Sequence, residues 1–176
     1  RHADVAAADA DTAELVRGYA DRIAPLARRV VGGTGEPLTR ANGQLGALAA
    51  AAQRELAGAD VALVNPGSLR ADLDAGPLLY EELFAVHPYD FPLLRLELRG
   101  GELRALLAAL RTAGDDPEAY YAGPARIDLR ATYTVSANEW MATGAGFPAL
   151  RDAGRRLPGS PGSETEALVR YVEQSR

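Results

Sequence analysis

Two segments with different patterns of apolar residues constrain the fold more than any other feature of this sequence. Residues 59–65 are almost continuously apolar and end at Pro66-Gly67, which indicates a short buried strand followed by a turn. Residues 92–99 alternate leucine with arginine or glutamate, which indicates a strand with only one face in the core. The chain therefore contains a β-sheet, and helices have to cover it.

Helices are predicted where apolar residues recur every three or four positions. The first opens at Asp11-Thr12-Ala13-Glu14, which has the form of a capping box, and Pro25 should kink or interrupt it. A second helix, residues 45–56, is rich in alanine, and its small side chains suit close packing against a sheet. Further helices are predicted at residues 80–86 (helix or turn), at 102–110 after the Gly100-Gly101 turn, and after the cap Ser163-Glu164-Thr165-Glu166.

The remaining segments complete the assignment of fold class. Strands are predicted at residues 131–137 and 127–129, and loops at residues 115–124 and 151–162. Helices and strands follow one another without a strict βαβ rhythm, so we predict an α+β fold with a mixed β-sheet flanked by helices. No internal repeat or second domain is evident. Residues 1–176 are therefore expected to form a single domain, in which residues 1–37 are an N-terminal helix and lead-in.

Composition and charge exclude several classes of function. The 176 residues have a net charge of -5, which gives no electrostatic support for nucleic-acid binding. Cysteine is absent, so disulfides, thiolate catalysis and cysteine-based metal sites are excluded. No apolar run approaches the length of a membrane-spanning helix. All 19 basic residues are arginine, which we attribute to coding bias, so each arginine has to be argued individually.

Residues that carry hydrolytic chemistry are scarce. The two histidines, His2 and His87, are isolated, and no D-x-H, G-N-H-E or H-x-H metal-ligand motif is present. P-loop and G-x-S-x-G motifs are absent as well. Several acidic residues are better explained as solvated side chains than as paired catalytic carboxylates: Asp72, Asp74, Glu81, Glu82 and Asp115-Asp116. We therefore predict no catalytic residue and no metal ligand in this chain.

Five short motifs follow one another between about residue 38 and the end of the chain. They are Leu45-Gly46-Ala47-Leu48, Asn65-Pro66-Gly67-Ser68-Leu69-Arg70, Val86-His87-Pro88-Tyr89, Leu96-Glu97-Leu98-Arg99-Gly100-Gly101-Glu102-Leu103 and Tyr133-Thr134-Val135-Ser136-Ala137-Asn138-Glu139-Trp140-Met141-Ala142. In order and spacing they resemble segments of the C-terminal domain of the family of 5'-nucleotidases, UDP-sugar hydrolases and 2',3'-cyclic phosphodiesterases. Each motif alone is weak, but five in sequence are fairly specific.

This resemblance implies a division of labour between two domains. In the family, an N-terminal metallophosphoesterase domain holds two divalent metal ions and attacks the phosphate, while the C-terminal domain grips the base and ribose. The resemblance thus implies a nucleotide-recognition domain without a cofactor of its own, inactive when isolated. Its partners would be the catalytic domain of the same polypeptide, absent from this chain, and a nucleoside or nucleotide. It also implies a bacterial, extracytoplasmic location, either secreted or at the cell wall.

The resemblance assigns roles to four residues that suit the chemistry of nucleotide binding. Tyr89 and Trp140 match the two aromatic positions that hold the base between them, and they should face each other across roughly 7 Å, which is two stacking distances. Asn65 would contact the base edge, because a carboxamide both donates and accepts. Arg70 would bind the ribose-phosphate end. The alternatives are ordinary core rings, a turn-stabilising Asn and a solvated Arg.

Two further positions resemble binding residues of the family. Arg40, upstream of the second helix, looks like a phosphate-binding arginine, although its spacing to Gly46 differs by about one residue. Gly123 resembles a glycine whose backbone lies close to the base, an approach that the missing Cβ permits. An ordinary loop glycine is the alternative at that position.

The sequence also departs from the family pattern. Residues 143–147 read Thr-Gly-Ala-Gly-Phe where the family has G-G-D-G, so the aspartate that holds the ribose hydroxyls is missing. The second helix has Ala47 and Ala51 in place of Asn and Asp, and the segment between Leu110 and Tyr133 is short enough to lack a hairpin. A second hypothesis therefore remains: a structural or interaction domain that keeps the fold without binding nucleotides.

Overall fold

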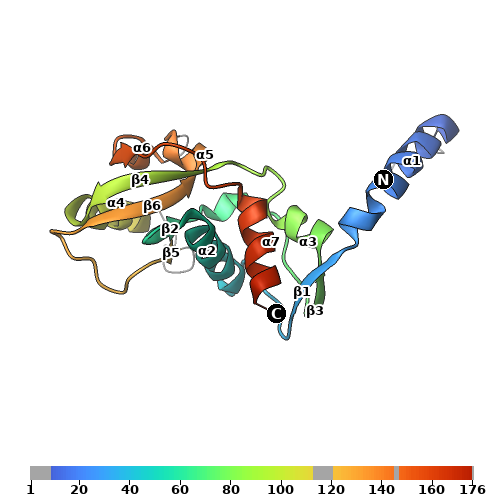
Figure 1. Cartoon of the computed structure of the whole chain (residues 1–176), viewed down its shortest axis with the longest axis horizontal. Helices are drawn as coiled ribbons and strands as arrows, with labels where there is room; N and C mark the ends of the chain where they lie inside the picture. Colours follow the sequence, from blue (N-terminus) through green and yellow to red (C-terminus); the bar gives the residue numbers. More distant parts are fainter. Residues whose placement is uncertain (1–8, 113–120, 145–146, 176) are drawn as a thin grey trace, which may run out of the picture.

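A mixed five-stranded sheet forms one end of the molecule in the computed structural model, which describes residues 9–112, 121–144 and 147–175 (Figure 1). Its strand order is β5-β2-β6-β4-β7. Only β2 and β6 run parallel, and the other neighbouring strands pair antiparallel. The strands are β2 (Val61–Leu63), β4 (Leu93–Arg99), β5 (Tyr121–Ala122), β6 (Thr132–Asn138) and β7 (Arg155–Arg156). The predicted α+β class with a mixed sheet is confirmed.

The alternating pattern of β4 has the predicted structural result. Leu94, Leu96 and Leu98 are buried, whereas the charged residues between them are half-buried or exposed. Leu96 and Leu98 pack in a cluster with apolar residues of β2, β6 and the helix α4 (Gly100–Thr112). The short helices α5 (Glu139–Ala142) and α6 (Pro148–Arg151) add Met141 and Leu150 to the same cluster.

A second buried cluster lies around the alanine-rich helix α2 (Gln44–Ala57), whose predicted existence is confirmed. The small side chains of α2 allow it to contact both the sheet and α7 (Glu164–Gln174) closely. The short helix α3 (Tyr80–Val86) and a two-stranded sheet of β1 (Val30–Thr34) and β3 (Gly76–Leu79) complete this cluster. Figure 1 shows α7 between the five-stranded sheet and the β1–β3 pair.

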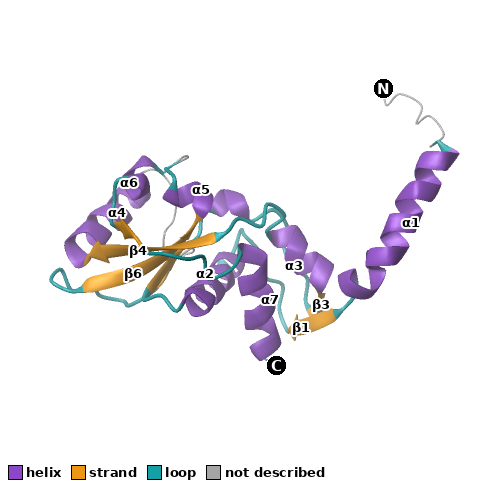
Figure 2. Cartoon of the chain, turned by 45° about the horizontal axis from the view of Figure 1, so that its top comes forward, coloured by secondary structure: helices purple, strands orange, loops and turns teal. Residues whose placement is uncertain are grey.

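Helix α1 (Ala10–Ala27) projects away from the remainder of the chain, as both overall views show (Figures 1 and 2). None of its residues is buried, and several large apolar side chains are exposed: Leu15, Val16, Tyr19, Ile23 and Leu26. The apolar pattern that predicted this helix therefore does not face the core of the chain. None of the described helices is long and apolar enough to cross a membrane.

Removing residues 1–27 should leave the free energy of unfolding nearly unchanged, by less than roughly 1 kcal/mol, because α1 buries no side chain. Urea denaturation followed by circular dichroism measures this. A longer deletion, residues 1–34, should destabilise strongly, because it also removes β1 and the fully buried Val31. A large loss in the shorter variant would contradict this separation.

Several local predictions were wrong for identifiable reasons. The cap of α1 is Asp9, whose carboxylate accepts from Thr12 N at 2.8 Å, two residues before the predicted capping box. Pro25 lies inside α1, which continues to Ala27, so the helix is not interrupted at the proline. Residues 127–129 form no strand, because they cross the start of α4 rather than pair with the sheet. The strand β3 was not predicted, and β5 and β7 lie in segments predicted as loops.

Candidate functional site

Two asparagines mark the edge of the sheet where the parallel strands β2 and β6 end. Asn65 follows β2, and Asn138 is the last residue of β6. Because neighbouring parallel strands share a direction, their carboxyl ends meet at one edge of the sheet, the place where ligands commonly bind. The two side chains do meet, since Asn138 Nδ2 donates to Asn65 Oδ1 at 3.1 Å.

Trp140 is placed by the start of α5. Asn138 caps this helix, because its Oδ1 accepts from Met141 N at 2.8 Å. Met141 is buried in the core beneath the sheet, so the helix turns its other face outward. Trp140, on that face, remains 36% exposed.

Tyr89 is carried by a tight turn that spans residues 87–90. The turn closes with a hydrogen bond from Asp90 N to His87 O at 3.1 Å, and Asp90 takes a positive φ of 47°. The N-terminus of α7 anchors this turn through two hydrogen bonds. Thr165 N donates to Asp90 Oδ1, and Thr165 Oγ1 donates to His87 O. The turn is thus anchored at both ends, while Tyr89 between them is 57% exposed.

One pocket brings the two predicted rings together with the predicted amide. It has a volume of about 350 Å³ and is lined by Asn65, Gly67, Tyr89, Phe91 and Trp140. Three of its five lining residues are aromatic, and the only charged or amide side chain among them is Asn65. Such a wall of flat apolar faces with one polar group is typical of a site for a planar heterocycle.

Each of the two predicted rings is supported by a second ring. Tyr89 stacks on Phe91, with centroids 5.7 Å apart and an angle of 30° between the planes. Trp140 meets Phe147 edge to face, with centroids also 5.7 Å apart. These contacts restrict how far the exposed rings can rotate. Sequence reasoning did not single out Phe91 or Phe147; the Tyr-x-Phe spacing at 89–91 was the available signal for the former.

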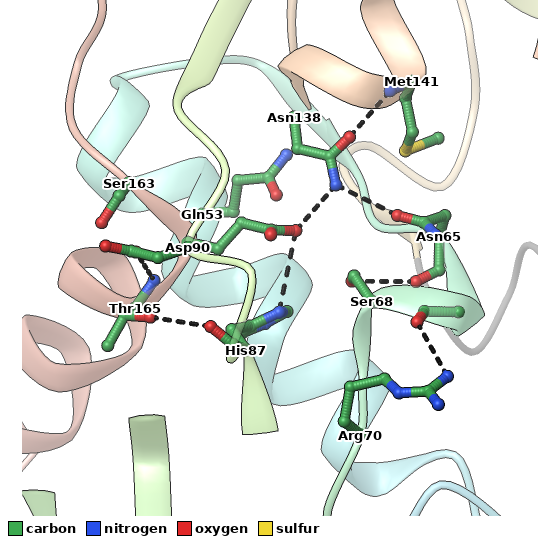
Figure 3. A network of polar contacts seen from close by, with 12 residues as sticks. Gln53, Asn65, Ser68, Arg70, His87, Asp90, Asn138, Met141, Ser163 and Thr165 are labelled. Atoms are coloured by element: carbon green, nitrogen blue, oxygen red, sulfur yellow. Dashed lines mark hydrogen bonds and ion pairs between the residues drawn. The ribbon is translucent and has the colours of Figure 1, made fainter. Parts of the chain in front are cut away.

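Behind the pocket lies a buried polar network that connects its parts (Figure 3). Asn138 Nδ2 donates to Glu164 Oε1 at 2.8 Å as well as to Asn65. His87 Nδ1 lies 3.7 Å from the same carboxylate oxygen. Asn138, His87 and Glu164 are each at most 2% exposed. Glu164 is the first residue of α7. The N-terminus of α7 therefore contacts Asn138, which bonds Asn65 and caps the helix of Trp140, and His87, which begins the turn of Tyr89.

Burial dominates the ionisation of this network. It raises the pKa of Glu164 to about 7 and lowers the pKa of His87 to about 4, in both cases against hydrogen bonds that favour the charged form. Between these two values both groups are neutral in the folded protein. His87 Nδ1 and Glu164 Oε2 have no hydrogen-bond partner among the described residues. His87 is thus a packed, buried side chain.

The two predicted arginines lie outside the pocket lining. Arg70 is exposed, and its Nη1 reaches the carbonyl of Gly67 at 3.5 Å, so it lies beside the rim. Arg40 is paired with Asp72, which accepts from both Arg40 N and Arg40 Nε. The backbone N–H and guanidinium of Arg40 lower the pKa of Asp72. Arg40 therefore already has an anionic partner, and only Arg70 is near the pocket.

Gly123 is not brought to the pocket. The register of β2 and β5 places it next to Val61, at the opposite end of β2 from Asn65. A Cβ there would lie 2.6 Å from Tyr121 Oη and 2.9 Å from a methyl of Val61. The close approach permitted by this glycine is to the side chains of Tyr121 and Val61 rather than to the pocket.

Among residues 9–112, 121–144 and 147–175, no group of three or more His, Asp or Glu side chains lies close enough to hold a metal ion. His2, Asp115-Asp116 and two residues of the 143–147 segment lie outside the described residues. Sequence reasoning did not assign a role to Asn138 or Glu164. Their buried, supporting positions leave no local sequence pattern, except that Asn138 caps α5 and Glu164 follows Ser163, the cap of α7.

Comparison with known proteins identifies the chain's relatives. A family model described as the C-terminal domain of 5'-nucleotidase matches residues 23–130. The endonuclease YhcR of Bacillus subtilis is 29% identical over 150 residues, which cover 73% of this chain and 12% of YhcR. The UshA protein of Yersinia enterocolitica is 36% identical over 76 residues, which cover 43% of this chain and 14% of UshA.

Solved structures share the fold. The 5'-nucleotidase precursor of Thermus thermophilus superposes with a TM-score of 0.75 at 24% identity, over 94% of this chain and 40% of that protein. The sulfate thiohydrolase SoxB of the same species gives a TM-score of 0.66 at 12% identity, over 94% and 36%. The chain thus spans less than half the length of each of these relatives.

Proposed function

The chain belongs to the family of 5'-nucleotidase C-terminal domains, and we propose that it recognises the base and ribose of a nucleotide for a bacterial 5'-nucleotidase-type metallophosphoesterase. The observation that carries this proposal is the pocket that contains Tyr89, Trp140 and Asn65 together. Three positions far apart in the sequence, proposed for one task, line one space of about 350 Å³.

The pocket suits a nucleobase in its shape and its chemistry. Tyr89 and Trp140 present aromatic faces that remain partly exposed and so are available to a ligand. Stacking a base on such faces contributes roughly 1–3 kcal/mol per base and tolerates different bases. Asn65 supplies the polar contact to the base edge, which fixes the orientation of the base between Tyr89 and Trp140.

The arginine at the rim then binds the charged part of the ligand. Arg70 lies beside Gly67, and within the described residues its guanidinium is bonded only to a backbone carbonyl. Its fork of donors is free to bind a phosphate or the ribose edge. Arg40 would have to release Asp72 first, so we assign it a minor part.

Cleavage of the phosphate ester falls to a partner in this proposal. By the family relationship, we assign the two divalent metal ions and the nucleophilic water to an N-terminal metallophosphoesterase domain of the same polypeptide. The present chain holds the nucleotide by its base and thereby orients the phosphate toward that domain. An extracytoplasmic location is part of the same proposal, since it rests on the family relationship.

A second candidate is a structural or interaction domain that has lost nucleotide binding. The observation in its favour is the segment 143–147, which has no acidic residue to hold the ribose hydroxyls. A fold neighbour such as SoxB, a sulfate thiohydrolase by its description, shows that this fold also occurs in a protein of a different class. The two candidates differ in whether the pocket binds a nucleoside at all.

Titration with adenosine, AMP and UMP should quench the fluorescence of Trp140, the chain's single tryptophan, because a stacked base lies against its ring. Tyr89→Ala should weaken binding roughly ten- to a hundredfold, because it removes the opposing ring. Tyr19→Ala is the matched control, since Tyr19 is equally exposed but lies on the projecting helix α1. No quenching by any of the three compounds at millimolar concentration would favour the structural domain.

A further inference from the structure

A chain of amide contacts behind the pocket has only one consistent direction of hydrogen bonding. It begins at the backbone N–H of Met141, which can only donate and which points at the side chain of Asn138 at 2.8 Å. The amide oxygen of Asn138 therefore has to face Met141, because the opposite orientation would set two buried donors against each other. The orientation of Asn138 is thus fixed by the N-terminus of α5.

The second amide follows from the first. With its oxygen on Met141, Asn138 has its Nδ2 directed at two acceptors, Glu164 Oε1 at 2.8 Å and Asn65 Oδ1 at 3.1 Å. Both hydrogens of this amide group are then used. Asn65 must present its oxygen to Asn138, which leaves its own Nδ2 on the other side.

The free end of Asn65 faces Gly67. A Cβ built on Gly67 would lie 3.3 Å from Asn65 Nδ2, and both residues line the pocket. No hydrogen bond from Asn65 Nδ2 to another described residue is formed. Figure 3 shows the side-chain oxygen of Asn65 turned toward Asn138. The NH2 group of the pocket's single side-chain amide, and not its carbonyl, therefore lies on the side of Gly67 and the pocket.

We propose that Asn138, held by Met141 N and Glu164, is a positioning residue that locks Asn65 as a hydrogen-bond donor, so that the pocket selects planar heterocycles with an acceptor atom at the facing edge. The ligand part of this inference rests on the proposed function, whereas the locked orientation of Asn65 does not. For an adenine ring the acceptor is one of the ring nitrogens N1, N3 or N7. A ring that presents a donor at that edge would meet the donor of Asn65 and be rejected.

The orientation is tested without ligand by NMR. In the wild-type chain the Nδ2 protons of Asn65 should show nuclear Overhauser effects to an Hα of Gly67. In Asn138→Asp, measured at pH 6, the introduced carboxylate still caps Met141 N and accepts from Asn65, so the amide of Asn65 reverses and these effects disappear. Glu164→Gln is the matched control: its amide oxygen accepts from Asn138 as the carboxylate did, and the effects should persist.

The ligand preference is tested with 1-deaza-, 3-deaza- and 7-deazaadenosine, each of which replaces one acceptor nitrogen by C–H at nearly unchanged stacking area. One analogue should bind the wild-type chain roughly tenfold more weakly than adenosine, because it leaves the donor of Asn65 unpaired. That loss should vanish in Asn138→Asp and persist in Glu164→Gln. Asn138→Ser, which keeps a capping oxygen but has no amide donor, should also abolish the loss and serves if the aspartate variant does not fold.

The outcomes separate the two proposals. If adenosine binds and all three deaza analogues bind equally well, the donor assignment is overturned while nucleotide recognition stands. If the Overhauser effects to Gly67 are absent from the wild-type chain, the locked orientation is overturned. If they are present but no nucleoside binds, the proposed function fails and the ligand preference fails with it, while the positioning role of Asn138 stands.

Discussion

Glu164→Gln should make the free energy of unfolding rise by about 3 kcal/mol between pH 4 and pH 6.5, a range in which the wild-type chain changes little through this network. The reason is that Glu164 and His87 titrate in the folded state with pKa values displaced in opposite directions. Both are almost completely buried, so the displacement is felt as stability rather than screened by solvent.

The contribution of Glu164 has the following sign. Burial raises its pKa from 4.5 to about 7, so between these values the folded chain holds a proton that the unfolded chain has released. Stability from this group is therefore fully present below pH 4.5 and is lost as the pH rises to about 7. The loss corresponds to about 3 kcal/mol, at 1.36 kcal/mol per pKa unit.

The contribution of His87 has the opposite sign. Burial lowers its pKa from 6.5 to about 4, so in this range the unfolded chain binds a proton that the folded chain lacks. Stability from this group is present above pH 6.5 and is lost as the pH falls to about 4. Asp90, the charged group that acts on both His87 and Glu164, is retained in every variant, so it does not confuse the comparison.

The measurement is urea denaturation at pH 4 to 8 of three proteins: wild type, Glu164→Gln and His87→Gln. Removing the carboxyl leaves the rising contribution of His87, whereas removing the imidazole should leave a stability that falls by about 3 kcal/mol between pH 4.5 and 7. Each variant is compared with wild type at the same pH, which cancels the titration of surface groups. Parallel curves for all three proteins would show that these buried groups do not titrate as described.

Gly100→Ala should destabilise the chain by about 3 kcal/mol at neutral pH. Gly100 is the first residue of α4, where the chain turns from β4 into the helix, and its N–H donates to Ala131 O. A Cβ at this position would lie 1.9 Å from the carbonyl oxygen of Asp128 and 2.9 Å from the Cα of Leu129. Both are backbone atoms, so the overlap is relieved only by moving the segment away from the sheet.

The neighbouring glycine provides the control. A Cβ on Gly101 would meet nothing within 4 Å, and alanine is favoured over glycine in a helix by about 1 kcal/mol. Gly101→Ala should therefore be neutral or slightly stabilising in the same denaturation experiment. Equal effects of the two substitutions would mean that the packing of residues 128 and 129 against α4 is not what requires a glycine.

Elements whose apolar pattern matches one buried face could be predicted from the sequence. The alternation in β4 and the alanine-rich stretch of α2 each face the core as their patterns indicate. The strand β3 was missed because it is short and contains Gly76 and Pro77, and its pairing with β1 is a long-range contact that no local pattern encodes. The projecting helix α1 shows the converse, since a clear apolar stripe there has no partner within the described chain.

Residues of the candidate site could be predicted only where the side chain itself, an aromatic ring or an amide, suggests how it would bind a ligand. Tyr89, Trp140 and Asn65 were selected by resemblance and by the properties of rings and amides, and the fold places all three in one pocket. Their roles toward a ligand remain predictions. Gly123 and Arg40 lie elsewhere, because spacing along the sequence does not reveal the register of β5 or the presence of Asp72. The support from Glu164 depends on a contact between α7 and the end of β6 that only the tertiary structure shows.

The position of α7 in the chain also determines when the pocket can exist during protein synthesis. Asn65, Tyr89 and Trp140 leave the ribosome before Glu164 and Thr165, which hold their supports in place. About a hundred residues separate Asn65 from Glu164, and at the usual rate of translation they take roughly 5–20 s to synthesise. A nascent chain that ends before α7 contains Tyr89 and Trp140 but lacks the contacts from Glu164 and Thr165 that hold the pocket in place. Under the proposed function, binding of a nucleoside therefore requires that synthesis has proceeded through α7.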